Sequence, residues 1–239
     1  MYFLLYLRAS LSASLVGYAK NALPKGYSMI TPCFEVVGGG NYAIDSLVLE
    51  GVDDTQATVQ IVNADGSWGA MGVWLNEYID PSTSEIYPAG WFTDGSGATS
   101  AEISLTPGQA VFFYTTSEIA KAMSAGQVSA SIPVTLDKGY SMIGNASPVA
   151  LSIDSITLAG VDDTQATVQV VNPDGSWGTM GVWLNEYTDP STNEVYPAGW
   201  FTDGSGATPA DITLEPGQSV FFYTTAEGAT ATIPSALAQ

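Results

Sequence analysis

Hydrophobic and polar residues alternate in short runs along most of the chain, which predicts β-strands. In residues 58–62, valine and isoleucine alternate with threonine and glutamine, and the Asp-Gly pair at 65–66 then predicts a hairpin turn. A Pro-Gly turn at 107–108 precedes a second β-rich run at 111–116. Only residues 117–125 are compatible with a short helix. The pattern therefore predicts an all-β fold.

The chain contains an internal repeat. Residues 51–116 match residues 160–225 at a constant offset of 109, with 55 identities in 66 positions and no gap. The sequence KGYSMI at 25–30 recurs at 138–143, and four extra residues in the first copy, around 38–40, predict a loop. Such self-similarity at a fixed period indicates a duplicated structural unit.

The repeat divides the chain into four predicted segments. Two tandem copies of a small antiparallel β-sandwich or barrel occupy residues 20–116 and 129–239, since each copy is long enough to form its own core. A linker, helical in part, occupies residues 117–128 between them. Residues 1–19 form an N-terminal apolar extension, which is either an extension strand or the remnant of an export signal.

Three short segments that flank the two copies resemble one another. They are SASLV at 12–16, SASIPV at 129–134 and TATIPS at 230–235. If each copy uses one of them, one strand is left over and can be added to a sheet of another molecule. Alternatively, a copy uses one such strand at its start and another at its end, and the sequence leaves both interpretations open.

The charge of the chain is strongly negative. There are 24 acidic and 5 basic residues, which gives a formal charge of −19, and both long repeats lack Lys and Arg altogether. Nucleic-acid binding needs clustered Lys and Arg, so this composition argues against it. An anionic membrane surface is also repelled, and the apolar extension is a poor membrane span because Arg8 interrupts it. We therefore expect neither nucleic-acid binding nor membrane insertion.

Histidine and paired cysteines are missing. The sequence has no histidine, which excludes Ser-His-Asp and Cys-His catalysis and histidine metal sites. The single cysteine, Cys33, cannot form an internal disulfide, and its apolar neighbours predict a buried small hydrophobe.

Carboxylates recur in both copies, in the segment around each Pro-rich loop. They are Glu77, Asp80 and Glu85, with counterparts Glu186, Asp189 and Glu194. A carboxylate pair can hydrolyse glycosides, but a domain of this size offers little depth for a substrate cleft. We expect no enzymatic activity, and we expect the segment containing these residues to be a long polar loop.

Calcium is an alternative use of the acidic loops, although no cofactor or metal site is predicted. Aspartates lie in Gly- and Ser-rich turns that could supply oxygen ligands, namely Asp53, Asp54, Asp65, Asp80 and Asp94. However, the chain has no Asp-x-Asp-x-Asp-Gly loop, and Asp-Gly-Ser sequences are primarily turn formers.

Tryptophan is the other candidate for ligand binding. The six residues are Trp68, Trp74, Trp91, Trp177, Trp183 and Trp200. Planar rings with nearby polar groups bind the apolar faces of sugars, and two copies would add avidity on a polymeric glycan. In small β domains, however, such rings also form the core. Exposed rings would favour a glycan surface, and buried rings would remove its support.

Two motifs resemble a known type of domain. The sequence GYSMIGN at 139–145 and the later PGQSVFFYT at 216–224 resemble a small β domain that recurs in bacterial secreted and surface proteins. The opening VGYAKNALPKGYSMITP at 16–32 is similar to the mature starts of such proteins. This resemblance implies export and a β fold but no assigned activity. Copy one departs from the pattern at Thr31 and Pro32, where copy two has Gly144 and Asn145.

The leading functional hypothesis is an extracellular or cell-surface structural protein that self-associates. The apolar extension would add as a strand to the next subunit, head to tail, and build a homo-oligomer, a fibre or a surface layer. The residues expected to carry this contact are Tyr2, Phe3, Leu4, Leu5, Tyr6, Leu7, Leu11, Ala13 and Leu15. The alternative hypothesis is a cell-surface carbohydrate-binding module.

Overall fold

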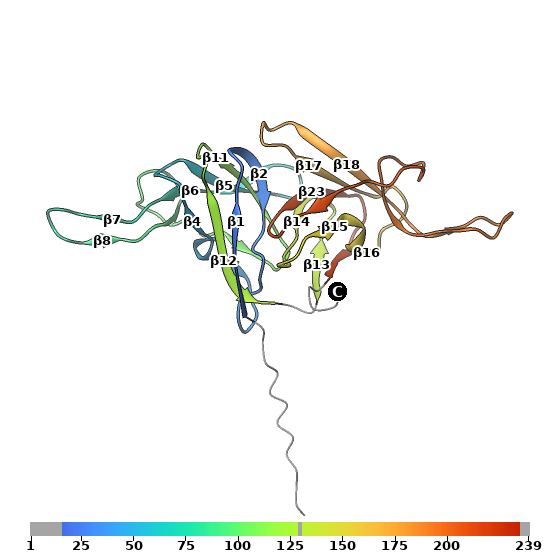
Figure 1. The fold of residues 1–239 in the computed structure, drawn as a ribbon, viewed down its shortest axis with the longest axis horizontal. Helices are drawn as coiled ribbons and strands as arrows, with labels where there is room; N and C mark the ends of the chain where they lie inside the picture. The colour runs from blue at the N-terminus through green and yellow to red at the C-terminus, as the bar shows by residue number, and fades with distance from the viewer. Residues whose placement is uncertain (1–15, 129–130, 235–239) are drawn as a thin grey trace, which may run out of the picture.

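The computed structural model describes residues 16–128 and 131–234, and these residues are all-β (Figure 1). Apart from strands and loops, the described residues form only two short 3-10 helices, η1 (Ile44–Ser46) and η2 (Ile153–Ser155). No helix in these two ranges is long and apolar enough to cross a membrane. The predicted all-β fold class is confirmed, with several small antiparallel sheets.

The same set of sheets occurs twice. In the N-terminal half, residues 16–128, the five-stranded sheet has the order β2 (Gly26–Ile30), β11 (Val111–Thr115), β5 (Ala57–Val62), β6 (Trp68–Leu75) and β9 (Gly90–Phe92). The three-stranded sheet has the order β1 (Val16–Ala22), β12 (Lys121–Gln127) and β4 (Val48–Glu50). Two short pairs complete this half, namely β3 (Tyr42–Ala43) with β10 (Ser104–Leu105), and β7 (Tyr78–Ile79) with β8 (Ile86–Tyr87).

The C-terminal half, residues 131–234, repeats this order strand for strand. Its five-stranded sheet contains β14 (Gly139–Gly144), β23 (Ser219–Thr224), β17 (Ala166–Val171), β18 (Trp177–Leu184) and β21 (Gly199–Phe201). Its three-stranded sheet contains β13 (Ser131–Leu136), β24 (Ala229–Pro234) and β16 (Thr157–Ala159). The short pairs are β15 (Leu151–Ser152) with β22 (Thr213–Leu214), and β19 (Tyr187–Thr188) with β20 (Val195–Tyr196).

Alternation along the strands decides what enters the core. In β11, Val111 and Phe113 are fully buried. Phe112 and Tyr114, which alternate with them, are partly exposed on the other face. The expected hairpin is present, because β5 pairs with β6 across the turn at residues 63–67. Each half therefore has its own large apolar cluster.

The two halves contact each other through reciprocal backbone hydrogen bonds. The amide of Tyr27 donates to the carbonyl of Pro173 at 2.8 Å, and the amide of Tyr140, the counterpart of Tyr27, donates to the carbonyl of Ala64 at 2.8 Å. The bonds from Thr31 to Gly217 and from Gly144 to Gly108, both 2.9 Å, are related in the same way. Because each bond has a counterpart in the opposite direction, the halves are related by an approximate twofold axis.

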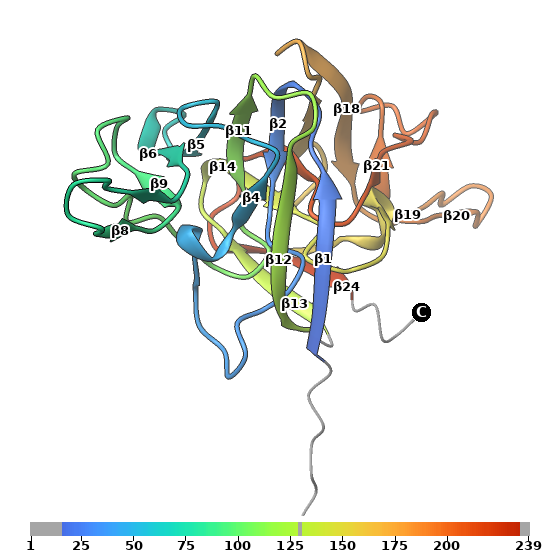
Figure 2. The same cartoon turned by 60° about the vertical axis from the view of Figure 1, so that its left-hand side comes forward.

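A small apolar cluster lies between the halves. Met29 and Ala110 from one half pack with Met142 and Val171 from the other. The larger sheets of the two halves form a propeller-like ring of four blades. Figure 2 shows one of these sheets, in which β1, β12 and β4 lie side by side. The prediction of two separate tandem sandwich domains is therefore not confirmed, because the halves share this cluster.

The strands at the ends of each half differ from the sequence prediction. Residues 121–127, expected within a linker that is helical in part, form strand β12, which pairs with β1 and β4. The helix prediction was wrong because the alternation of buried Ala122 and Ser124 with more exposed residues is that of a strand. Strand β1 begins at Val16, so the observed strands do not stop at the predicted boundaries of 20 and 117.

The similar segments at 129–134 and 230–235 contribute to strands of the same half. Strand β13 pairs with β24 in the register Ser131 with Pro234 to Leu136 with Ala229. In the N-terminal half β1 and β12 pair in the same manner. The C-terminal half therefore uses one similar segment at its start and another at its end, as the second interpretation proposed. Most of the first similar segment, 12–16, lies outside the described residues.

The close approach of the halves predicts the effect of an added methyl group at Gly26. A Cβ atom there would lie 1.9 Å from the Pro173 carbonyl oxygen, and Gly26 has φ +100°. We expect Gly26→Ala to lower the free energy of unfolding by at least about 3 kcal/mol, because strain and a backbone clash combine. Urea denaturation followed by circular dichroism measures this change.

Gly38→Ala is the matched control. Gly38 has a similar φ of +90° but nothing within 4 Å of the added Cβ. It should lose only about 1 kcal/mol, the cost of a side chain at positive φ. Equal losses for the two variants would show that the contact between the halves does not depend on Gly26.

Candidate functional site

Two hairpins project from opposite ends of the long axis of the molecule (Figure 1). We call them the N-terminal arm, β7–β8, and the C-terminal arm, β19–β20. The sequence predicted long polar loops here, but Tyr78 pairs with Tyr87 and Tyr187 pairs with Tyr196 across the two ladders. The structure therefore replaces each predicted loop by a two-stranded ribbon.

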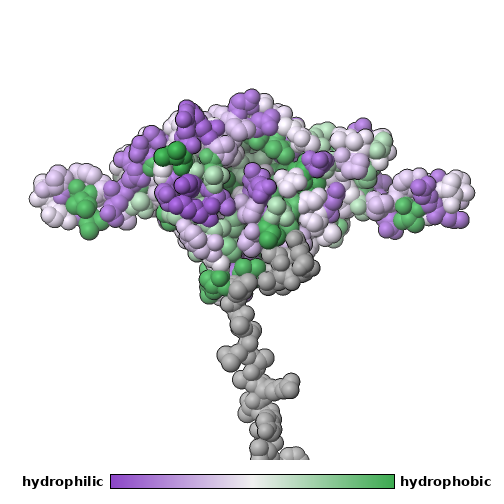
Figure 3. Space-filling model, in the orientation of Figure 1, coloured by the Kyte–Doolittle hydropathy of each residue, from purple (hydrophilic) through white to green (hydrophobic). Residues whose placement is uncertain are grey.

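Each arm exposes most of its apolar side chains. In the N-terminal arm Tyr78, Ile79, Ile86 and Tyr87 have exposed fractions between 46% and 60%. Hydrophobic residues are visible on both arms in the space-filling view (Figure 3). The rings of Tyr78 and Tyr87 lie 6.2 Å apart across the ribbon. The arms therefore carry apolar side chains of which about half of the surface is exposed.

The six tryptophans divide into two groups. Trp74, Trp91, Trp183 and Trp200 are buried in the two large cores, where Trp74 and Trp91 meet edge to face with centroids 5.4 Å apart. By contrast, Trp68 and Trp177 are 53% and 55% exposed. The four buried rings expose almost no surface, so only Trp68 and Trp177 remain of the residues predicted for a glycan surface.

The exposed tryptophans belong to aromatic clusters that the sequence analysis missed. Trp68 contacts Phe112 at 5.2 Å between centroids, and Tyr27 contacts Phe112 at 5.6 Å and Tyr114 at 4.8 Å. Trp177, Phe221, Tyr140 and Tyr223 form the equivalent cluster in the C-terminal half. The outward positions of Phe112 and Tyr114 in the strand alternation were the signal that could have identified them.

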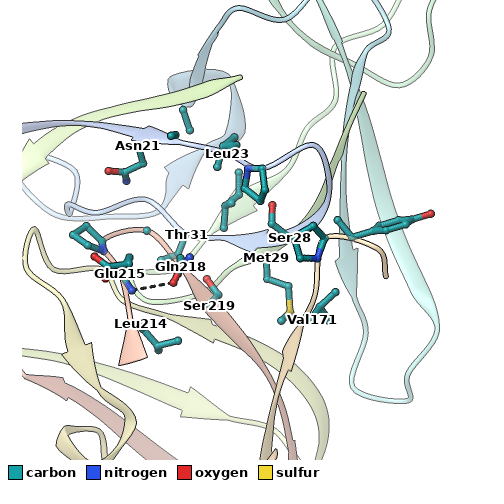
Figure 4. A pocket seen from close by; sticks show the side chains of 18 of the residues that line it. Asn21, Leu23, Ser28, Met29, Thr31, Val171, Leu214, Glu215, Gln218 and Ser219 are labelled. Carbon is teal, nitrogen blue, oxygen red and sulfur yellow. Dashed lines mark hydrogen bonds between the residues drawn. The ribbon is translucent and has the colours of Figure 1, made fainter. Parts of the chain in front are cut away.

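A groove runs between the two halves (Figure 4). It has a cavity volume of about 510 Å³ and is lined by Ser28 and Met29 from one half and by Val171 and Ser219 from the other. The buried hydroxyls of Ser28 and Ser219 have no hydrogen-bond partner. The equivalent groove on the other side of the approximate axis measures about 440 Å³ and has Ala110 in place of Ser219. Both grooves follow from the contact between the halves.

Several of the carboxylates that were candidates for catalysis or calcium binding accept hydrogen bonds from nearby residues. Asp80 accepts hydrogen bonds from the amide of Ser82 at 2.7 Å and from its hydroxyl at 2.6 Å. Asp65 and Asp94 do the same with Ser67 and Ser96, and Glu85 accepts a bond from the Tyr87 hydroxyl. No group of three or more Asp, Glu, His or Cys residues that could hold a metal ion occurs in residues 16–128 and 131–234.

These hydrogen bonds lower the pKa of the turn carboxylates. In Asp80 and Asp189 the serine hydroxyl is the largest cause, followed by the serine amide, because both bonds favour the charged form. The other aspartates whose pKa falls below 3.8 for the same reason are Asp65, Asp94, Asp174 and Asp203.

Cys33 is 1% exposed, so the prediction of a buried small hydrophobe is confirmed. Burial raises the pKa of its thiol, which keeps the thiol protonated and unreactive. The amide of Asn21 donates to its sulfur at 3.1 Å. This cysteine is therefore part of the packing between β1 and its neighbours.

Comparisons with known proteins identify no relatives. No family model matches the chain, and no significant match was found among the curated proteins or the solved structures. The resemblance to domains of bacterial secreted proteins therefore stays a prediction.

The turn carboxylates predict a dependence of stability on pH. Their pKa is lower in the folded chain than in the unfolded chain, so they stabilise the fold above pH 3.8, and this stabilisation is lost as the pH falls through the lowered folded value. In Ser82→Ala, the loss of the hydroxyl donor should raise the pKa of Asp80 toward 3.8. Carbon-detected NMR titration of the aspartate carboxyls measures this shift.

Ser155→Ala is the control for this titration, since the Ser155 hydroxyl donates to the Ser152 carbonyl and not to a carboxylate. It should leave the pKa of Asp80 unchanged. An unchanged pKa of Asp80 in Ser82→Ala would contradict the assigned cause.

Proposed function

We propose that this chain is a secreted, extracellular structural protein that self-associates into a fibre or surface layer and has no catalytic role. The observation that supports the proposal best is the pair of projecting arms with exposed apolar side chains at opposite ends of the molecule (Figure 1). The extracellular location rests on the resemblance to secreted bacterial domains.

A contact between arms would stabilise them. A two-stranded ribbon is marginally stable in water by itself, and these ribbons expose tyrosine, isoleucine and valine side chains. Packing one arm against the arm of another copy would remove this apolar surface from water, at about 25 cal/mol per Å² buried. Contact between two arms would therefore be stabilised by the apolar surface that both arms bury.

The number of arms determines the kind of assembly. Each molecule has two nearly identical arms, and every contact uses one arm from each of two molecules. A molecule bound through one arm keeps the other arm free, so growth continues at both ends. Association through arms therefore gives linear polymers and not closed dimers.

We also propose that each half is a sandwich-type module. In each half the strands β1, β12 and β4, or their counterparts, belong to a three-stranded sheet, and the five-stranded sheet contributes to the same apolar cluster. Two such modules in one chain would present the two arms with the same chemistry, which supports a polymer with repeating, equivalent contacts.

Strand addition by the N-terminal extension remains part of the proposal. The extension residues predicted to carry it, Tyr2, Phe3, Leu4, Leu5, Tyr6, Leu7, Leu11, Ala13 and Leu15, lie outside the described residues. Strands β1 and β13 are at the edges of three-stranded sheets, and an edge strand can accept a strand from another molecule.

Removing apolar side chains from the arms tests the arm contact. We expect the unmodified chain to form a concentration-dependent series of polymers in sedimentation velocity. Tyr78→Ser with Ile86→Ser should block the N-terminal arm and stop assembly at dimers, because only one arm per molecule remains. Adding Tyr187→Ser and Val195→Ser should leave monomers.

Ile119→Ser is the matched control, because Ile119 is 71% exposed but lies outside both arms. It should leave the polymer distribution unchanged. Each arm carries acidic residues, such as Glu85 and Glu194, so higher salt should lengthen the polymers by screening their repulsion. A monomeric unmodified chain at high protein concentration and high salt would refute the proposal.

A truncated chain that starts at Val16 tests strand addition separately, since it retains all of β1. If residues 1–15 link the copies, the truncated chain should form shorter polymers than the full chain at the same concentration. Negative-stain electron microscopy compares their lengths. Equal lengths would show that strand addition by this segment plays no part, while leaving the arm contact untouched.

A further inference from the structure

The two five-stranded sheets are free of charge in a chain with a formal charge of −19. None of their ten strands contains Asp, Glu, Lys or Arg. The acidic side chains of the two hairpin turns that precede Trp68 and Trp177, Asp65 and Asp174, accept hydrogen bonds from Ser67 and Ser176 within those turns. The outer faces of these sheets therefore suit an uncharged ligand.

Aromatic rings form much of these outer faces. Tyr27 and Trp68 are 37% and 53% exposed in the N-terminal half, and Tyr140 and Trp177 are 37% and 55% exposed in the C-terminal half. Phe112 and Phe221 pack beneath them and also contact the small core between the halves. The two clusters thus flank the approximate twofold axis and are held in place by the same packed residues.

Neutral hydrogen-bonding groups lie beside the rings. In the register of the sheet, Gln60 is adjacent to Phe112 and Thr58 is adjacent to Tyr114, and all four side chains are partly exposed on one face. Among the described residues, neither the Gln60 amide nor the phenol groups of Tyr27 and Tyr114 have a side-chain hydrogen-bond partner. The surface therefore offers apolar planes together with unused donors and acceptors.

We propose that these two aromatic clusters bind a neutral polysaccharide. A pyranose ring has an apolar face that packs on an aromatic plane and hydroxyls around its edge that pair with amide and phenol groups. A strongly anionic protein does not repel an uncharged sugar, whereas it would repel a polymer of uronic acids. This function is separate from self-association, because the clusters lie on the sheets and not on the arms.

The tilt between neighbouring rings limits the form of the ligand. The ring planes of Tyr27 and Phe112 differ by 42°, and those of Trp68 and Phe112 differ by 60°. A flat crystalline polysaccharide surface needs coplanar rings. These clusters instead fit a single soluble chain whose successive sugar rings rotate about the chain axis, and two clusters per molecule add avidity on a long chain.

Affinity gel electrophoresis of the full chain tests the proposal. The mobility of the protein is compared in gels with and without mixed-linkage β-glucan, mannan or dextran, and with polygalacturonate as the anionic probe. We expect retardation by at least one neutral polysaccharide and none by polygalacturonate. Trp68→Ala with Trp177→Ala should weaken the binding at least tenfold, and the single variants should weaken it less.

Two further variants separate binding from structure. Trp68→Phe with Trp177→Phe keeps an aromatic plane and should retain most of the retardation, whereas Ile119→Ala should behave like the unmodified chain. The proposal is overturned if none of the three neutral polysaccharides retards the protein, or if the double alanine variant is retarded as strongly as the unmodified chain. Loss of self-association in the double alanine variant, measured by sedimentation velocity, would instead assign these faces to a second copy of the chain and overturn the proposal as well.

Discussion

Backbone hydrogen bonds cross in both directions between the two halves of the chain, and the relative position of every outward-facing surface depends on them. Tyr27 donates to Pro173 and Tyr140 donates to Ala64, and the glycines that precede these tyrosines, Gly26 and Gly139, leave room for the carbonyl oxygens. A side chain at either glycine would meet a carbonyl oxygen at 1.9 Å. The two halves can therefore approach this closely only because glycine occupies both positions.

This arrangement has two consequences for function. It directs the two arms to opposite ends of the molecule, which is the geometry a linear polymer needs (Figure 1). It also brings Phe112 and Phe221 onto one small core, so that an aromatic cluster lies on either side of the axis. A polymer built through the arms would then display many such clusters along its length, and a long polysaccharide could contact several of them.

The distribution of charge fits both proposals. Carboxylates are concentrated in turns and loops, where serine hydroxyls and amides hold residues such as Asp80 and Asp189, while the five-stranded sheets carry none. This placement leaves the neutral faces of the sheets uncovered by charged side chains. In the proposed assembly, the same carboxylates on the arms would oppose contact between copies, and salt would screen this repulsion.

The sequence by itself determined the all-β class, the duplication, the hairpin between β5 and β6 and the burial of Cys33, because alternation, turn residues and self-similarity are local features of the chain. It could not separate Trp68 from Trp74, since both lie in one strand, and only the other elements packed around that strand cover Trp74 and leave Trp68 exposed. The arms were missed for a similar reason, because the pairing of Tyr78 with Tyr87 across a Pro- and Ser-rich turn has no strong alternating pattern. The tertiary structure alone decided how the halves meet, since residues more than 70 positions apart, such as Tyr140 and Ala64, come together only in the folded chain.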